Sequence, residues 1–177
     1  LQAELPAIEV ILPEQRTPAG QCKCLSVRQP WTWLLTHPEV VAGCGIEPKV
    51  LENRNWSTHY RGQLLLHAGA AIETNFFDHQ SGLLLPDYWS WKFGKAGERL
   101  AQAMPQHRGE YATRSIVGVA ELVDVVVESH SLWFVGKYGL MLAQARAIAS
   151  PVVYPGSRML FEVPDIPPLS LVREALQ

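Results

Sequence analysis

Residues 114–127 read Arg114-Ser-Ile-Val-Gly-Val-Ala-Glu-Leu-Val-Asp-Val-Val-Val127, and they carry the strongest strand signal in this chain of 177 residues. Valine and isoleucine dominate the stretch, and β-branched side chains favour strands because they pack well on a pleated surface. Glu121 lies in its middle, where a carboxylate among apolar neighbours is costly unless it is paired or faces a cavity. We therefore predict a strand over residues 114–127 and treat Glu121 as a candidate site residue.

Shorter strand patterns lie on both sides of this stretch, over residues 23–27, 50–56, 63–68, 138–142, 151–154 and 159–163. A helix is predicted to begin at Pro30, because proline at the first helical position loses no hydrogen bond, and to end or kink at Pro38. Residues 89–103 are expected to be largely helical. Strands and helices do not alternate regularly, so this order predicts an α+β domain: a small, mostly antiparallel β-barrel with helices packed at one end.

Composition excludes several classes of protein. Apolar residues make up 47% of the chain and charged residues 18%, against roughly 25% charged in an average globular protein, so disorder does not fit. Uncharged stretches fall short of the roughly 20 apolar residues of a membrane span, so no membrane partner is predicted. The formal charge of −2 excludes a globally basic nucleic-acid-binding surface but leaves room for a local basic groove.

The predicted organisation is an extended or disordered leader over residues 1–21, one domain over residues 22–164 and a C-terminal tail over residues 165–177. The first residues hold several prolines and no basic segment before an apolar core, so they do not resemble a signal peptide. Cys22, Cys24 and Cys44 are an odd number of cysteines, which indicates a reducing compartment, and we expect a cytoplasmic protein.

Familiar metal and cofactor signatures do not match. Cys22-x-Cys24 has no second pair at zinc-ligand spacing, and His59 and His67 do not supply one. Neither a phosphate-binding loop, a dinucleotide fingerprint nor a nucleophile elbow is found. We predict no metal and no cofactor.

Basic and aromatic side chains alternate between residues 25 and 61, a mixture that suits a nucleotide. Cations neutralise phosphates, and each base stacked on an aromatic ring contributes roughly 1–3 kcal/mol. The alternative is that the tryptophans belong to the core and the charges to a solvated face. The candidate nucleic-acid-binding residues are Arg28, Gln29, Trp31, Lys49, Arg54, Trp56, Tyr60 and Arg61.

Glu52 is the second carboxylate in a predicted strand with apolar neighbours. It lies three residues from Lys49 and two from Arg54, so a structural ion pair would explain it. The other interpretation is a cleft in which Lys49, Glu52 and Glu121 meet and shift one another's pKa values. Since a neighbouring carboxylate favours the ammonium form, we expect Glu52 to keep Lys49 charged.

A series of motifs along residues 22–164 resembles the activating signal cointegrator homology (ASCH) domain. These are Leu25-Ser-Val-Arg-Gln-Pro-Trp31, Lys49-x-x-Glu52-x-Arg54, Tyr60-Arg-Gly-x-Leu-Leu-Leu-His67, Gly118-Val-Ala-Glu121, Trp133-Phe-Val-Gly-x-Tyr-Gly139 and Gly156-x-x-x-Leu-Phe-Glu162. The resemblance implies a PUA-like β-barrel, related to RNA-binding domains of RNA-modifying enzymes, with a cleft between barrel and helices that binds RNA or a nucleotide.

Some small members of this family are amidohydrolases that act on acetylated cytidine through a lysine, a threonine and a glutamate. Lys49 takes the place of that lysine and Glu121 that of the glutamate, but Glu52 stands where the threonine would be. A carboxylate cannot replace a hydroxyl as a neutral nucleophile without a change of mechanism.

Two functions therefore stay open. The first is binding of RNA, another single-stranded nucleic acid or a modified nucleotide. The second is hydrolysis of a modified nucleoside or of RNA, with Lys49, Glu52 and Glu121 as the catalytic candidates.

Overall fold

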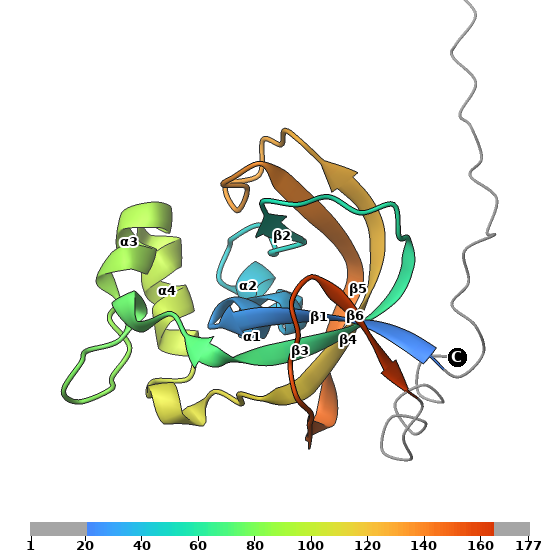
Figure 1. The fold of residues 1–177 in the computed structure, drawn as a ribbon. Coiled ribbons are helices and arrows are strands. Elements are labelled where there is room, and N and C mark those ends of the chain that lie inside the picture. The colour runs from blue at the N-terminus through green and yellow to red at the C-terminus, as the bar shows by residue number, and fades with distance from the viewer. Residues whose placement is uncertain (1–20, 165–177) are drawn as a thin grey trace, which may run out of the picture.

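The computed structural model describes residues 21–164, which form an α+β fold on one six-stranded sheet (Figure 1). The strands lie in the order β2-β5-β4-β3-β1-β6. Their bounds are Gln21–Gln29 (β1), Leu51–Arg54 (β2), Gly62–Ile72 (β3), Ser115–Val126 (β4), Tyr138–Val153 (β5) and Leu160–Pro164 (β6). Within the same residues, the α-helices are Trp31–Thr36 (α1), Pro38–Gly43 (α2), Asp87–Phe93 (α3) and Lys95–Ala103 (α4), with 3₁₀ turns at Thr74–Phe76 and Arg108–Glu110.

The sheet is mixed and mostly antiparallel, as predicted. β1 pairs with β3 in parallel, and the other four pairings are antiparallel. The short strands β2 and β6 are the two edges, and no ladder joins them in the described part of the chain, so the curved sheet is not the closed barrel that we predicted. A side-chain contact does link β2 with β1, the neighbour of β6: Arg54 Nη2 donates to the Ser26 carbonyl oxygen over 2.7 Å.

Several strands differ in extent from the prediction. β1 (Gln21–Gln29) and β3 (Gly62–Ile72) are longer than the predicted 23–27 and 63–68. The strand expected at residues 138–142 and all but the last residue of the one expected at 151–154 are parts of one 16-residue strand, β5. Its middle is rich in alanine and has little strand propensity, but pairing with β4 through several register shifts holds it extended. At one edge of the sheet, β2 covers only four residues of the predicted 50–56.

The α-helices lie in the two segments for which they were predicted, after Pro30 and around residues 89–103, and are divided there. α1 ends at Thr36 and Pro38 is the first residue of α2, while Gly94, at φ 59°, separates α3 from α4 within the predicted helical stretch. α1 packs against the sheet, on β1 and β5 above all, and buries Leu34 and Leu35. α3 and α4 approach so closely at Gly97 that a Cβ there would lie 1.8 Å from the Trp89 carbonyl oxygen.

β1 begins at Gln21, so this residue belongs to the domain and not to the predicted leader. The rest of that leader and the predicted tail lie outside the described residues. Between residues 21 and 164, no helix is both long enough and apolar enough to cross a bilayer. The cytoplasmic location stays a prediction.

Candidate functional site

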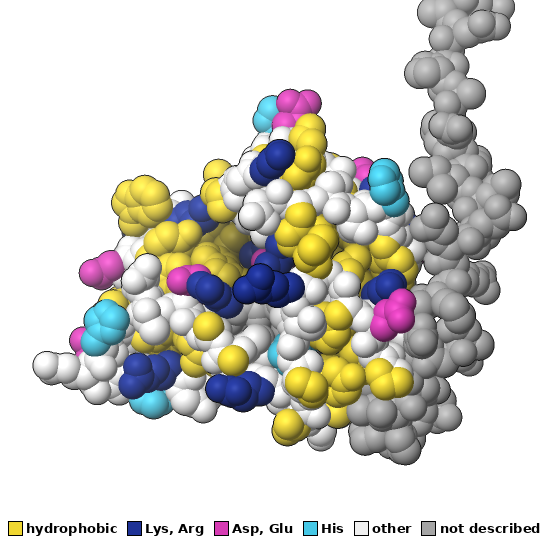
Figure 2. All heavy atoms as spheres, in the orientation of Figure 1, with side chains coloured by type: hydrophobic (Ala, Val, Ile, Leu, Met, Phe, Trp, Pro, Cys, Tyr) yellow, Lys and Arg dark blue, Asp and Glu magenta, His cyan; other side chains and the backbone are white. Residues whose placement is uncertain are grey.

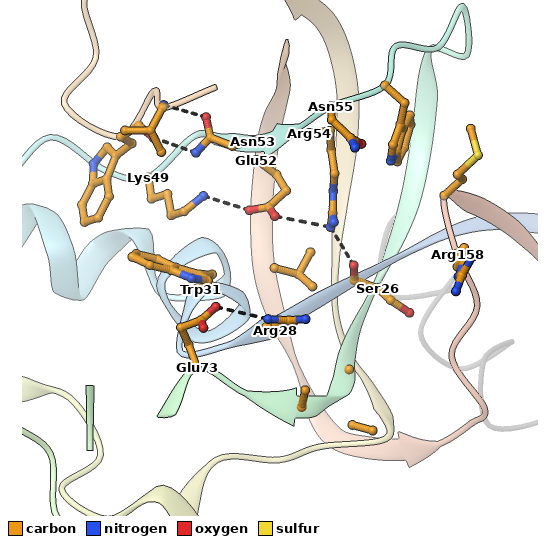
Figure 3. Close-up of a pocket in the computed structure, with 18 of the residues that line it drawn as sticks. Ser26, Arg28, Trp31, Lys49, Glu52, Asn53, Arg54, Asn55, Glu73 and Arg158 are labelled. Carbon is orange, nitrogen blue, oxygen red and sulfur yellow. Dashed lines mark hydrogen bonds and ion pairs between the residues drawn. The ribbon is translucent and has the colours of Figure 1, made fainter. Parts of the chain in front are cut away.

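A pocket of about 1300 Å³ opens where segments far apart in the sequence meet (Figure 3). Its walls come from β1, from β2 and the residues beside it, from the end of β3, from α3, and from the loops at residues 133–135 and 157–159. Small-molecule sites usually measure about 300–1,000 Å³. The pocket therefore has room for a ligand larger than a nucleoside.

Positive charge dominates the pocket. Five basic side chains line it against two carboxylates, a formal excess of three positive charges in a chain whose formal net charge is −2. Figure 2 shows lysine and arginine side chains gathered around a hollow on this face. Such a surface attracts an anionic ligand. The basic residues are Arg28, Lys49, Arg54, Lys92 and Arg158, and the acidic ones are Glu52 and Glu73.

One carboxylate holds two of these cations (Figure 3). Glu52 Oε2 accepts from Lys49 Nζ at 3.0 Å, and Glu52 Oε1 lies 3.3 Å from Arg54 Nη2. Lys49 Nζ also donates to the Leu51 carbonyl oxygen. The ion-pair interpretation of Glu52 is therefore confirmed, and the pair faces the pocket.

Burial of the side chain, and not the charge of Glu52, decides the direction in which the pKa of Lys49 changes. The Lys49 side chain is 2% exposed, and loss of solvent lowers the pKa of its ammonium group below the ordinary 10.5. The charge of Glu52 opposes this shift, and Arg54 adds to it. That Lys49 stays charged remains a prediction: the opposing effect of Glu52 is the one expected, but the sequence did not reveal that Lys49 is enclosed.

Aromatic rings form part of the wall and connect it to the core. Trp31 makes edge contacts with Phe76 and Trp89 at centroid distances of 5.2 and 5.9 Å, and Lys49 Nζ lies 6.0 Å from the Trp31 ring centre. Trp31 is thus both a core residue and a pocket residue. The aromatic residues of the lining are Trp31, Trp56, Tyr88 and Trp133.

Asn53 fixes the loop that carries Trp133. Its Nδ2 donates to the Trp133 carbonyl oxygen at 2.9 Å, and its Oδ1 accepts from the Val135 N–H at 2.8 Å. The Trp133 indole N–H in turn donates to the Glu47 carbonyl oxygen at 2.7 Å. These bonds hold one side of the pocket in place.

A buried histidine fixes the loop that carries Arg158. His67 Nε2 donates to the Tyr154 carbonyl oxygen at 2.8 Å, so Nδ1 of the neutral ring accepts from the Ser26 hydroxyl at 2.9 Å. Burial lowers the pKa of His67 below 6.5, which favours this neutral form. A Cβ at Gly156 would lie 2.7 Å from the His67 ring, so the loop can pass only with glycine there.

The pocket brings together five of the eight predicted binding residues: Arg28, Trp31, Lys49, Arg54 and Trp56. Gln29 does not line it, since its buried side chain donates to the Ala112 carbonyl oxygen and accepts from the Trp33 N–H.

Tyr60 and Arg61 also lie outside the lining. The Tyr60 hydroxyl donates to the Gln63 carbonyl oxygen, and Arg61 pairs with Asp124 at 3.2 Å. Tyr60 is therefore held by a local contact and Arg61 by an ion pair with β4, and neither side chain reaches the pocket.

Glu121 is separated from the other two catalytic candidates. It is exposed on β4, opposite Gln63 and Ala143, and does not line the pocket. The expected cleft shared by Lys49, Glu52 and Glu121 is therefore not formed. Alternation along β4 turns this carboxylate to solvent, which removes the burial cost that made it a candidate.

Sequence reasoning missed four prominent pocket residues: Tyr88, Lys92, Trp133 and Arg158. Trp133 and Arg158 fall within motifs of the family resemblance, which was the available signal. Tyr88 and Lys92 had no such signal, since their segment was hard to assign.

The cysteines belong to the core. Cys22, Cys24 and Cys44 are buried free thiols, and burial raises the pKa of Cys24 well above its usual range. Across residues 21–164, no group of three or more His, Cys, Asp or Glu side chains is placed to hold a metal ion.

A scan of the chain against models of known protein families gives no match, and a search of the curated proteins finds no match either.

Proposed function

We propose that the pocket binds a nucleotide unit of a single-stranded nucleic acid, with RNA as the expected form, or a modified nucleotide. One observation carries the proposal: an excess of cationic side chains and four aromatic residues line a single cavity. Phosphates need the first and bases the second.

Two arginines are well suited to contact phosphate. Arg158 makes no ion pair or hydrogen bond with another residue of the described part of the chain, so its guanidinium is available. Arg28 is 62% exposed, and its pair with Glu73 is long, at 3.6 Å. Exposed pairs contribute only about 0–1 kcal/mol, so a phosphate can compete with Glu73 for this arginine.

The fold is consistent with the proposal but does not identify a ligand. A curved, mostly antiparallel sheet with helices beside the pocket is compatible with a PUA-like domain, and the Arg54–Ser26 contact links the edge strand β2 to β1. The ASCH resemblance points to the same ligands.

Hydrolysis is the second candidate, favoured by the contact between Lys49 and Glu52 in the pocket wall. A lysine with a lowered pKa can serve as a base or nucleophile. Binding has the stronger support, because both Glu52 oxygens are engaged by cations and Glu121 lies outside the pocket.

Equilibrium binding tests the proposal. Labelled single-stranded RNA, single-stranded DNA and duplexes of equal length are titrated with the protein, and modified nucleosides are added as competitors. We expect single strands to bind more tightly than duplexes, with affinity that falls as salt rises. Absence of binding to every member of this panel would overturn the proposal.

Turnover is measured in parallel on acetylated cytidine and on RNA. The binding function predicts no turnover by the wild type. Turnover that is lost in folded Lys49→Ala and kept in Glu121→Gln would select the hydrolase.

A further inference from the structure

Trp91 is the most exposed tryptophan side chain of the described residues, at 80%. It lies on α3, whose Trp89 is fully buried and whose Tyr88 and Lys92 line the pocket. α3 is therefore anchored on one side and presents a large rigid ring to solvent on the other. Exposure of an indole gives up the favourable free energy that burial of a large apolar side chain provides.

The Trp91 ring continues an aromatic series that starts inside the pocket. Trp31 and Tyr88 both line the cavity, with ring centres 6.5 Å apart. Tyr88 and Trp91 follow at 6.1 Å with their planes at 43°. The series thus leads from the interior of the pocket to the outer surface of α3 in two short steps.

The charged side chains around Trp91 favour one side of the ring for a phosphate group. Lys92 is the next residue and lines the pocket, and Lys95 is exposed at the start of α4. Asp87, an exposed carboxylate, lies one helical turn before Trp91 on the same face. A phosphate leaving the pocket would therefore pass on the Lys92 side and avoid Asp87.

We propose that Trp91 is a second base-stacking site, placed so that one base of a single strand occupies the pocket while a neighbouring base stacks on the Trp91 indole. The phosphate between them lies near Lys92. This inference rests on the proposed function and deepens it, since it selects a single-stranded oligonucleotide over a free nucleotide as the ligand.

The test compares two probes on the same variants. One is an oligoribonucleotide of about six residues, within the site sizes of single-strand grooves, and the other is a mononucleotide with the base that binds best. Trp91→Ala should weaken oligonucleotide binding about 5- to 150-fold, the equivalent of one lost stack of roughly 1–3 kcal/mol. Mononucleotide affinity should stay unchanged.

Three further variants sharpen the result. Trp91→Phe keeps an aromatic face and should retain most of the oligonucleotide affinity. Val153→Ala, a control at an 83% exposed side chain outside the pocket, should change neither affinity. Asp87→Asn removes the neighbouring carboxylate and should strengthen oligonucleotide binding without affecting the mononucleotide.

Failure of the inference differs from failure of the proposed function. If the wild type binds both probes and Trp91→Ala binds the oligonucleotide as tightly as the wild type, the second site is wrong and the pocket function stands. If Trp91→Ala weakens both probes equally, Trp91 supports the pocket and is not a separate site. If the wild type binds neither probe, the proposed function fails and this inference with it.

Discussion

The Nζ of Lys49 lies 3.0 Å from Oε2 of Glu52, and both side chains are buried in the wall of a pocket in which basic residues outnumber acidic ones. Burial of a charge is costly unless a partner compensates it. Glu52 is that partner for Lys49 and also for Arg54, so two of the five cations of the pocket depend on this one carboxylate.

Glu52→Gln should therefore destabilise the domain by about 3–5 kcal/mol, the usual cost of leaving a buried charge uncompensated. Urea titrations of the wild type and the variant give the two free energies of unfolding whose difference tests this value. Adding Lys49→Met to Glu52→Gln should recover part of the loss, since the orphaned ammonium group is removed. Glu121→Gln is the control, expected within about 0.5 kcal/mol of the wild type because Glu121 is exposed. Equal effects of Glu52→Gln and Glu121→Gln would contradict the buried pair.

Arg54→Lys should weaken the link between β2 and β1. The Arg54 guanidinium lies 3.3 Å from Glu52 Oε1 and donates to the Ser26 carbonyl oxygen at 2.7 Å, and an ammonium group cannot reproduce this planar fork. We expect a loss of about 1–3 kcal/mol, as for one hydrogen bond to a charged group. Arg146→Lys, at an exposed position on β5, should be nearly neutral. A neutral Arg54→Lys would show that the contact does not hold the strands together.

Gly156→Ala should disturb the loop that carries Arg158, since a Cβ there would lie 2.7 Å from the His67 ring and 2.9 Å from Ser26 Oγ. Overpacking of this kind costs about 1–3 kcal/mol and should also weaken nucleotide binding through Arg158. At Gly43, in α2, nothing lies within 4 Å of a Cβ, so Gly43→Ala should be neutral or stabilise by up to about 1 kcal/mol. Thermal unfolding of the two variants distinguishes these cases.

Stability should fall in mild acid because of His67. Its pKa is below 6.5 in the folded protein, so the unfolded chain binds more protons once the pH drops below that value. The contribution of neutral His67 is fully present above about pH 6.5 and is lost as the pH falls toward the folded pKa. His67→Asn should flatten this part of the pH profile of unfolding, whereas His59→Asn, at an exposed position, should leave it intact. An unchanged profile in His67→Asn would assign the acid sensitivity to other groups.

The fold was largely predictable because its strands carry local signals. Valine and isoleucine in residues 114–127 indicated β4, and Pro38 indicated where the first helix ends. The length of β5 was not predictable, since pairing with β4 and not propensity keeps its alanine-rich middle extended. Closure of the sheet was also beyond local signals, because it depends on how two short edge strands meet.

The site residues were predictable where several of them come from one short segment of the sequence. Lys49, Glu52 and Arg54 lie close in sequence, and their ion pairs follow from that spacing. Glu121 was misassigned because alternation along a strand does not say which face is buried. Tyr88 and Lys92 enter the pocket only because α3 packs beside Trp31, a tertiary contact that no spacing reveals.

Charge reversal at Arg158 tests the nucleotide-binding pocket most directly, because this arginine lines the cavity and has no ion pair with any other residue of the described part of the chain. Affinity for a single-stranded oligoribonucleotide is measured at several salt concentrations for the wild type, Arg158→Glu and Arg146→Glu, which makes the same charge change at an exposed site outside the pocket. We predict that Arg158→Glu weakens binding at least about tenfold and reduces the salt dependence by about one phosphate contact, while Arg146→Glu stays near the wild type. Equal effects of the two reversals would mean that only overall charge matters, and the pocket would not be the binding site.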